Sequence, residues 1–191
     1  MTAVPRLIVE VRPFVGRPLI AFYAAILLAS LPLWPFGWHL GLHVLGAAFL
    51  IGNALVMAVW LTIAGVRGDD AAKRRSARVV NRADAWFTVP GVLLLLLNGW
   101  VMAGARYGGF PALLGTDFIA AGLALLTATG VVWALRLLPT QLALLRLATA
   151  PGSLDRVRFS ALLTRWYTWG VVATVMPIAA AVLMTTKPDL W

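Results

Sequence analysis

The chain has 191 residues, of which 61% are hydrophobic and 12% are charged, and its formal net charge is +9. Soluble domains carry about 25% charged residues, so this composition excludes an ordinary soluble globular domain. The absence of cysteine excludes disulfides, thiolate metal sites and redox thiols. The positive charge lies beside apolar runs, where membrane orientation and attraction to anionic lipid headgroups account for it. We therefore expect a lipid bilayer, and no nucleic acid, as the partner of these cations.

Five hydrophobic runs follow one another along the chain, at residues 18–35, 40–64, 85–105, 118–138 and 168–186. A membrane-spanning helix needs about 20 predominantly apolar residues, and each run meets or nearly meets that length. The pattern predicts an all-α fold, an integral membrane bundle of five transmembrane helices. We divide it into residues 1–37, a basic segment plus an extra first span, and a four-helix transmembrane unit at 38–191.

The distribution of cations predicts the orientation of this bundle. With the N-terminus inside, only Arg106 and Lys187 lie outside, and the other 14 of the 16 Lys and Arg residues lie inside. Since inner loops carry an excess of Lys and Arg, the sequence predicts an N-in, C-out topology. The loops 65–84 and 139–166 are then cytoplasmic, and we expect Asp84 to cap the start of the third span.

Three of the predicted spans carry small and polar residues at steps of three or four, so that they share one helix face. Such stripes let helices approach closely and form hydrogen bonds within the bilayer, so we expect them to face the bundle interior. The stripes are His39, His43, Gly46, Leu50, Asn53 and Met57; Asp84, Thr88, Gly91, Leu95, Asn98 and Met102; and Trp169, Ala173, Met176, Ala180, Met184 and Lys187. Ala48 and Gly52 add a pair of small residues for close helix approach.

Potential ligands converge at one depth, in the outer third of the bilayer. At 1.5 Å per residue, His39 and His43 lie at this level, and side chains of the third and fifth spans reach it as well. The candidate cofactor-binding residues are His43, Asn98, Met102, Arg106 and Lys187, and the candidate metal ligands are His43, His39 and Met184.

Three roles of His43 are consistent with the sequence. It could donate a hydrogen bond that only joins helices. It could ligate haem iron, with Arg106 and Lys187 paired to the propionates, whereas His39 would be an interfacial residue. Two histidines at i and i+4 cannot bind opposite faces of one haem. It could also join His39, Met102 and Met184 around Cu(I), which imidazole and thioether ligands suit.

The sequence carries no P-loop, GxGxxG, HExxH or Ser-His-Asp pattern. Glu10 is the only glutamate, and no aspartate is predicted at mid-membrane, so catalysis by paired carboxylates is not expected. Whether the protein catalyses any reaction stays open.

Four segments together resemble a bacterial family of predicted integral membrane proteins of unknown function. They are HVLGAAFLIGN, RADAWFTVPGVLLLLLNGWVMA, the PTQ…RLA segment and RWYTWG…LMTTKP, which cover about residues 38–188. The chain is also distantly similar to copper-resistance D type proteins and to the J-type protoporphyrinogen IX oxidase. The latter similarity implies haem b, with His43 at the position of the ligating histidine and Lys187–Pro188 at the terminal motif.

The expected function is that of a small multi-pass protein of the bacterial cytoplasmic (inner) membrane that binds haem b through His43 in a redox-associated role. The alternative is a non-catalytic accessory subunit of a larger membrane complex, in contact with other subunits or with copies of itself. The third is a copper-handling membrane protein.

Overall fold

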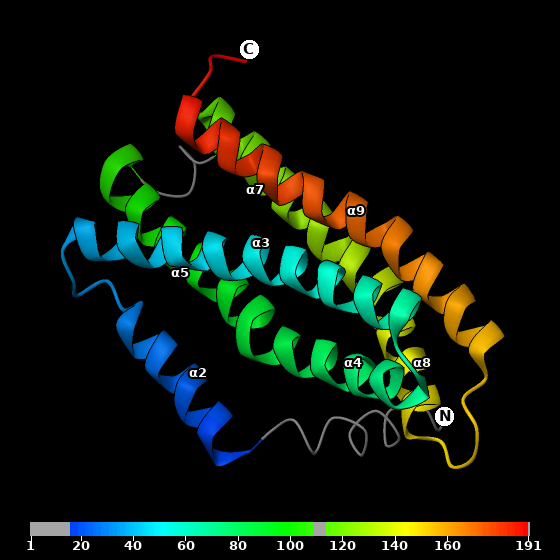
Figure 1. Cartoon of the computed structure of the whole chain (residues 1–191). Helices are drawn as coiled ribbons and strands as arrows, with labels where there is room; N and C mark the ends of the chain where they lie inside the picture. Colours follow the sequence, from blue (N-terminus) through cyan, green and yellow to red (C-terminus); the bar gives the residue numbers. More distant parts are fainter. Residues whose placement is uncertain (1–15, 109–113, 191) are drawn as a thin grey trace, which may run out of the picture.

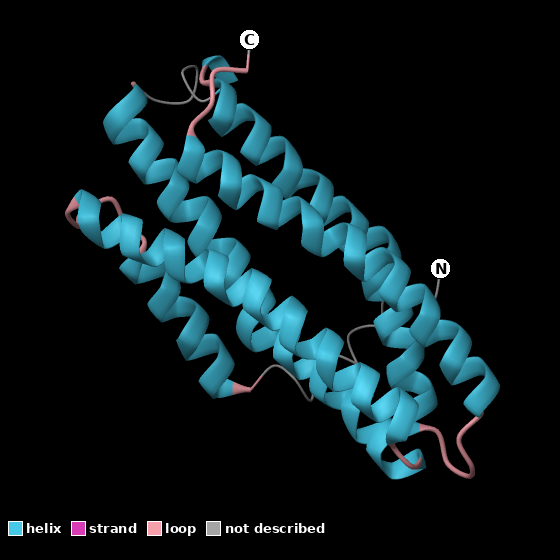
Figure 2. Cartoon of the chain, turned by 45° about the horizontal axis from the view of Figure 1, so that its top comes forward, coloured by secondary structure: helices cyan, strands magenta, loops and turns pink. Residues whose placement is uncertain are grey.

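The structure is a computed structural model that describes residues 16–108 and 114–190. Most of the predicted basic N-terminal segment falls at residues 1–15 and lies outside the described residues. The described parts are helical, joined by short loops, and contain no strand (Figure 2). The prediction of an all-α fold is therefore confirmed.

Four helical rods are long and apolar enough to cross a membrane. Two of them are continuous helices of more than one segment, because short π-helical turns (η2 and η3) interrupt the α-helix without ending it. The rods are α3 (Phe36–Arg67); α4 (Asp70–Ala83) with η2 (Asp84–Thr88) and α5 (Val89–Tyr107); α7 (Asp117–Val132) with η3 (Trp133–Leu137) and α8 (Leu138–Thr149); and α9 (Arg156–Thr186).

The first predicted span is shorter than expected. It forms α2 (Arg17–Ala29), a helix of 13 residues, which at 1.5 Å per residue is about 20 Å long, against a hydrocarbon core of about 30 Å. The turn after it contains Pro32 and Pro35, and α3 begins directly after Pro35. The described residues thus contain four candidate spans where the sequence predicted five.

The long helices associate as two pairs, α3 with α5 and α7 with α9, and α3 also packs against α9 (Figure 1). Gly46 and Gly91 lie at the crossing of α3 and α5. A Cβ atom on Gly46 would lie 2.7 Å from the Gly91 carbonyl oxygen, and one on Gly91 would lie 2.9 Å from the Gly46 oxygen. Only glycine at both positions permits this approach of two backbones. Gly52, by contrast, has open space at its Cβ position, so it makes no close helix contact with the residues that the structure describes.

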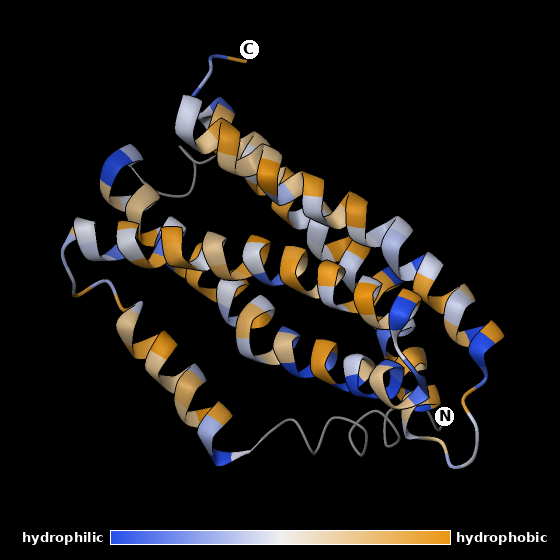
Figure 3. Ribbon diagram, in the orientation of Figure 1, coloured by the Kyte–Doolittle hydropathy of each residue, from blue (hydrophilic) through white to orange (hydrophobic). Residues whose placement is uncertain are grey.

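The predicted inner loops are largely helical. Residues 70–83 form α4, whose N-cap Asp69 accepts a hydrogen bond from the Ala72 N–H, and α4 packs against α8. Ala77 and Val80 of α4 are buried there with Leu144 of α8. Hydrophilic residues gather at this end of the bundle (Figure 3), and since many of them are Lys and Arg, we call it the cation-rich end. It comprises α4, α8 and the first turns of α9.

Each π-helical turn ends two residues before a proline, Pro90 after η2 and Pro139 after η3. Proline has no N–H, and its ring clashes with the carbonyl four residues earlier in an α-helix. A wider turn relieves this conflict. In η2 the N–H of Val89 donates to the carbonyl of Asp84. Asp84 is therefore not the N-cap that the sequence predicted but an interior residue of a helix that began at Asp70.

Candidate functional site

A buried chain of hydrogen bonds joins three segments at the end of the bundle opposite the cation-rich end, which we call the histidine end. Asn98 of α5 is fully buried, and its Nδ2 donates to the Ser30 hydroxyl at 2.9 Å and to the Leu94 carbonyl at 2.9 Å. Its Oδ1 lies 2.7 Å from Nδ1 of His39 on α3. The contact ties α3 to α5 and to the turn after α2.

This network determines the tautomer of His39. The Leu94 carbonyl can only accept a hydrogen bond, so the Asn98 amide must present Nδ2 to it and Oδ1 to His39. Nδ1 of His39 must then carry the proton, and in the neutral ring Nε2 carries a lone pair. His39 is 1% exposed, and its Nε2 is buried without a hydrogen-bond partner in the described structure. An unsatisfied buried acceptor is costly, so this nitrogen is the most unusual polar atom of the histidine end.

His39 also lines a groove of about 450 Å³ that is open on one side. The groove lies between the start of α3, the turn before it and the last turns of α5. Its lining is mostly aromatic and apolar: Pro32, Trp34, Phe36, Trp100, Val101, Met102, Gly104 and Ala105. A ligand in this groove would meet one imidazole and otherwise apolar surface.

His43 lies one turn further along α3, and its Nδ1 donates to the Leu95 carbonyl at 2.9 Å. Its ring rests against Gly99, where a Cβ atom would lie 3.0 Å from Cε1 of His43. Because a carbonyl can only accept, Nε2 of His43 also carries the lone pair. Both histidines are thus held in the tautomer that can bind a metal through Nε2.

The other predicted ligands divide between two places. Met102 lines the groove with His39, and Arg106 is exposed in the last turn of α5. Met184 instead packs against α7, since its Cε would lie 2.5 Å from a Cβ atom on Gly122. Lys187 is the exposed C-cap of α9. The described residues contain no cluster of three or more His, Cys, Asp or Glu side chains.

A second polar site lies nearer the cation-rich end, around the carboxyl group of Asp84. Oδ1 accepts from Nδ2 of Asn53 at 3.0 Å and from the hydroxyl of Thr88 at 2.8 Å. Oδ2 accepts from Nε2 of Gln141 at 2.7 Å. Asn53 also donates to the Thr88 hydroxyl at 2.8 Å. The site therefore connects α3, η2 and α8.

Gln141 and Ser30 belong to these networks, and Tyr23 bonds the residue after Asp84, but none of the three was singled out in the sequence. Gln141 and Ser30 are buried, and Tyr23 donates to the carbonyl of Ala85 at 2.6 Å. The available signal was a polar side chain in or beside an apolar run, which is costly unless it is satisfied.

A family model described as "Predicted integral membrane protein (DUF2269)" matches residues 40–188. The match includes His43, Asp84, Asn98 and Gln141 and begins just after His39. Comparisons with curated proteins and with solved structures gave no match.

Proposed function

The chain belongs to this family of predicted integral membrane proteins, and from that premise we propose that it binds haem b at the histidine end. The imidazole of His39 would bind the haem iron, and His43 is the second candidate ligand. The observation that carries the proposal is that His39 lines the groove and that its Nε2 is a buried lone pair without a hydrogen-bond partner in the described structure.

The residues of the groove fit a porphyrin. Its volume of about 450 Å³ lies within the usual range of about 300–1,000 Å³ for ligand pockets, and its open side allows a larger ligand to extend beyond it. Trp34, Phe36 and Trp100 offer aromatic surface to a flat macrocycle. Arg106 follows the groove residue Ala105 and is exposed, which suits a propionate. Lys187 and Met184 contribute no groove wall.

The chain's own residues would orient the ligand. Asn98 accepts from Nδ1 of His39, which holds the ring in one tautomer, and Ser30 and Leu94 in turn hold Asn98. Such a partner of a ligating histidine positions the ring and increases its basicity. The haem would supply a one-electron iron couple in an apolar surrounding, and the groove walls would restrict the access of water to it.

The test is the absorption spectrum of the protein purified from haem-replete cells. A Soret band that shifts on reduction is expected in the wild type. His39→Ala should abolish it, and Asn98→Leu should weaken the binding of added haemin because the imidazole loses its fixed orientation. Arg75→Ala, an exposed change at the cation-rich end, is the matched control and should bind haemin as the wild type does.

The variants also distinguish the candidate ligands and functions. Loss of the band in His43→Ala and its retention in His39→Ala would transfer the ligand role to His43. A colourless wild type that fails to bind added haemin would refute the haem proposal. Copper in its metal analysis would then favour the copper-handling function, and its absence would favour the accessory-subunit function.

A further inference from the structure

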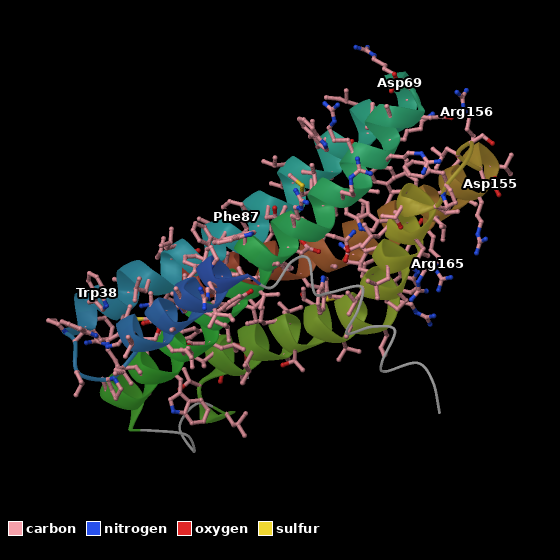
Figure 4. All side chains as sticks on the ribbon, turned by 90° about the horizontal axis from the view of Figure 1, so that it is seen from below. Trp38, Asp69, Phe87, Asp155, Arg156 and Arg165 are labelled. Atoms are coloured by element: carbon pink, nitrogen blue, oxygen red, sulfur yellow. The ribbon has the colours of Figure 1, made fainter. Side chains whose placement is uncertain are left out.

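Asp84 lies inside the apolar part of the bundle. On α3, Trp38 and Trp60 are about 33 Å apart at 1.5 Å per residue, which matches the thickness of a bilayer core. Asn53, which donates to Asp84, precedes Trp60 by about 10 Å on the same scale. Figure 4 shows Phe87, the close neighbour of Asp84 in η2, far from Asp69 and Arg156 at the cation-rich end. The carboxyl group is thus about two helical turns inside the apolar region.

The three hydrogen bonds that Asp84 accepts all come from neutral groups. Asn53, Thr88 and Gln141 present N–H or O–H donors to the two oxygens. The indole of Trp133 in η3 lies beside the same carboxyl group, and its N–H is buried without a hydrogen-bond partner in the described structure. This surrounding stabilises negative charge by oriented dipoles alone.

The arginines nearest to Asp84 in the sequence contact other groups or face away from the bundle. Arg78 points to the carbonyl of Ala148 at 3.5 Å, Arg82 is exposed, and Arg136 stacks over the ring of Trp169 at 5.1 Å. An ion pair in the described part of the chain, Arg156 with Asp70, lies at the cation-rich end, away from Asp84. The titratable group of Asp84 therefore faces neutral partners on α3, η2, η3 and α8.

An ionisable group within a membrane bundle is costly and marks a functional site by default. The neighbours of Asp84 offer hydrogen-bond donors rather than the several oxygen ligands that a hard metal ion needs, and the described residues contain no group of three or more His, Cys, Asp or Glu side chains that could hold a metal ion. The cation that this site can accept is a proton.

We propose that Asp84 is a proton-binding site that exchanges with water at the cation-rich end. The proton forms an O–H bond at Oδ2, which accepts from Gln141 in the structure, and converts the carboxylate into a neutral acid. The Gln141 amide then rotates so that its oxygen accepts the new O–H. Because Gln141 follows the second π-helical turn and Asp84 opens the first, proton uptake alters the contact between the two bulged helices. This site is independent of the haem proposal.

The test is infrared difference spectroscopy of the protein in lipid, between about pH 10 and about pH 6. Ordinary aspartates, with a pKa of about 3.9, stay ionised at both values, so they contribute no signal. The wild type should show a carboxylic-acid C=O band at the lower pH, and Asp84→Asn should lack it. Asp155→Asn, a change at the exposed N-cap of α9, is the control and should retain the band.

A second variant covers the case in which Asp84→Asn fails to fold. Gln141→Leu keeps the carboxyl group but removes the acceptor of the new O–H. Its band should move to higher frequency because the acid group then makes one hydrogen bond fewer. Absence of any such band in the folded wild type would overturn the proposal. A band that remains unchanged in Asp84→Asn, or unmoved in Gln141→Leu, would also overturn it.

Discussion

The hydroxyl of Tyr23 donates a hydrogen bond of 2.6 Å to the carbonyl oxygen of Ala85, and so joins α2 to the first π-helical turn. In a π-helical pattern the partner of this carbonyl would be the N–H of residue 90. That residue is a proline and has no N–H. The N–H of Val89 is already bonded to Asp84. Tyr23 therefore supplies the donor that the helix cannot.

Tyr23→Phe should destabilise the protein by about 1 kcal/mol, because a part-buried carbonyl loses its partner. The measurement is the midpoint of thermal unfolding in a mild detergent. Tyr107→Phe is the matched control, since the ring of Tyr107 packs against Phe118 and that packing survives the change. Equal midpoints for the two variants would argue against the role of the Tyr23 hydroxyl.

Gly46→Ala should destabilise the α3–α5 pair by roughly 1–3 kcal/mol, because the added methyl group meets backbone atoms that cannot move aside. Gly52→Ala makes the same chemical change on the same helix at a position with open space. It should be neutral or stabilise the helix by up to about 1 kcal/mol. Unfolding of both variants in one detergent series gives the comparison, and a Gly46→Ala protein as stable as Gly52→Ala would contradict the packing.

Arg74 holds the end of α8 through four carbonyl groups. Its guanidinium donates to Leu147, Ala148, Ala150 and Gly152 at distances of 2.7–3.3 Å. Lysine keeps the charge but lacks the planar array of donors.

We expect Arg74→Lys to cost about 2 kcal/mol and to expose the loop at residues 150–155 to limited proteolysis. Arg75→Lys, its exposed neighbour, should leave both the stability and the cleavage pattern unchanged. Similar cleavage of the two proteins would show that Arg74 does not hold this end of α8.

The N-in, C-out orientation stays a prediction that cysteine labelling can test, because the chain has no cysteine of its own. Ser153 and Asp189 are exposed at opposite ends of the bundle. An impermeant thiol reagent added to intact cells should label Asp189→Cys and not Ser153→Cys. The reverse pattern would invert the topology. Ser76 is unsuitable for this purpose because it is 3% exposed.

The pairing of α3 with α5 was predictable from periodicity. The two stripes of the sequence meet residue by residue, from His39 with Asn98 to Asn53 with Asp84. The spacing of the small and polar residues along a helix is a local property, so it can be recognised in the sequence. The stripe of the fifth span was less informative, because Met184 faces α7 rather than the two histidines.

The π-helical turns could not be predicted from the sequence. Asp84 precedes an apolar run and looks like an N-cap, but the helix before it is held by packing of Ala77 and Val80 against α8. That packing depends on residues more than 60 positions away along the chain. The continuation of the helix places Asp84 inside the apolar region instead of at its border.

Composition, hydrophobic run length and the position of cations determined by themselves that this is an α-helical membrane protein, because the bilayer imposes a local requirement on each segment. Only the tertiary structure decided which histidine carries a buried lone pair and which carboxylate is surrounded by neutral donors. Both results depend on partners from other helices, Asn98 for His39 and Gln141 for Asp84. A hydrogen bond between distant residues is a property of the packed bundle and has no signature in the local order of the chain.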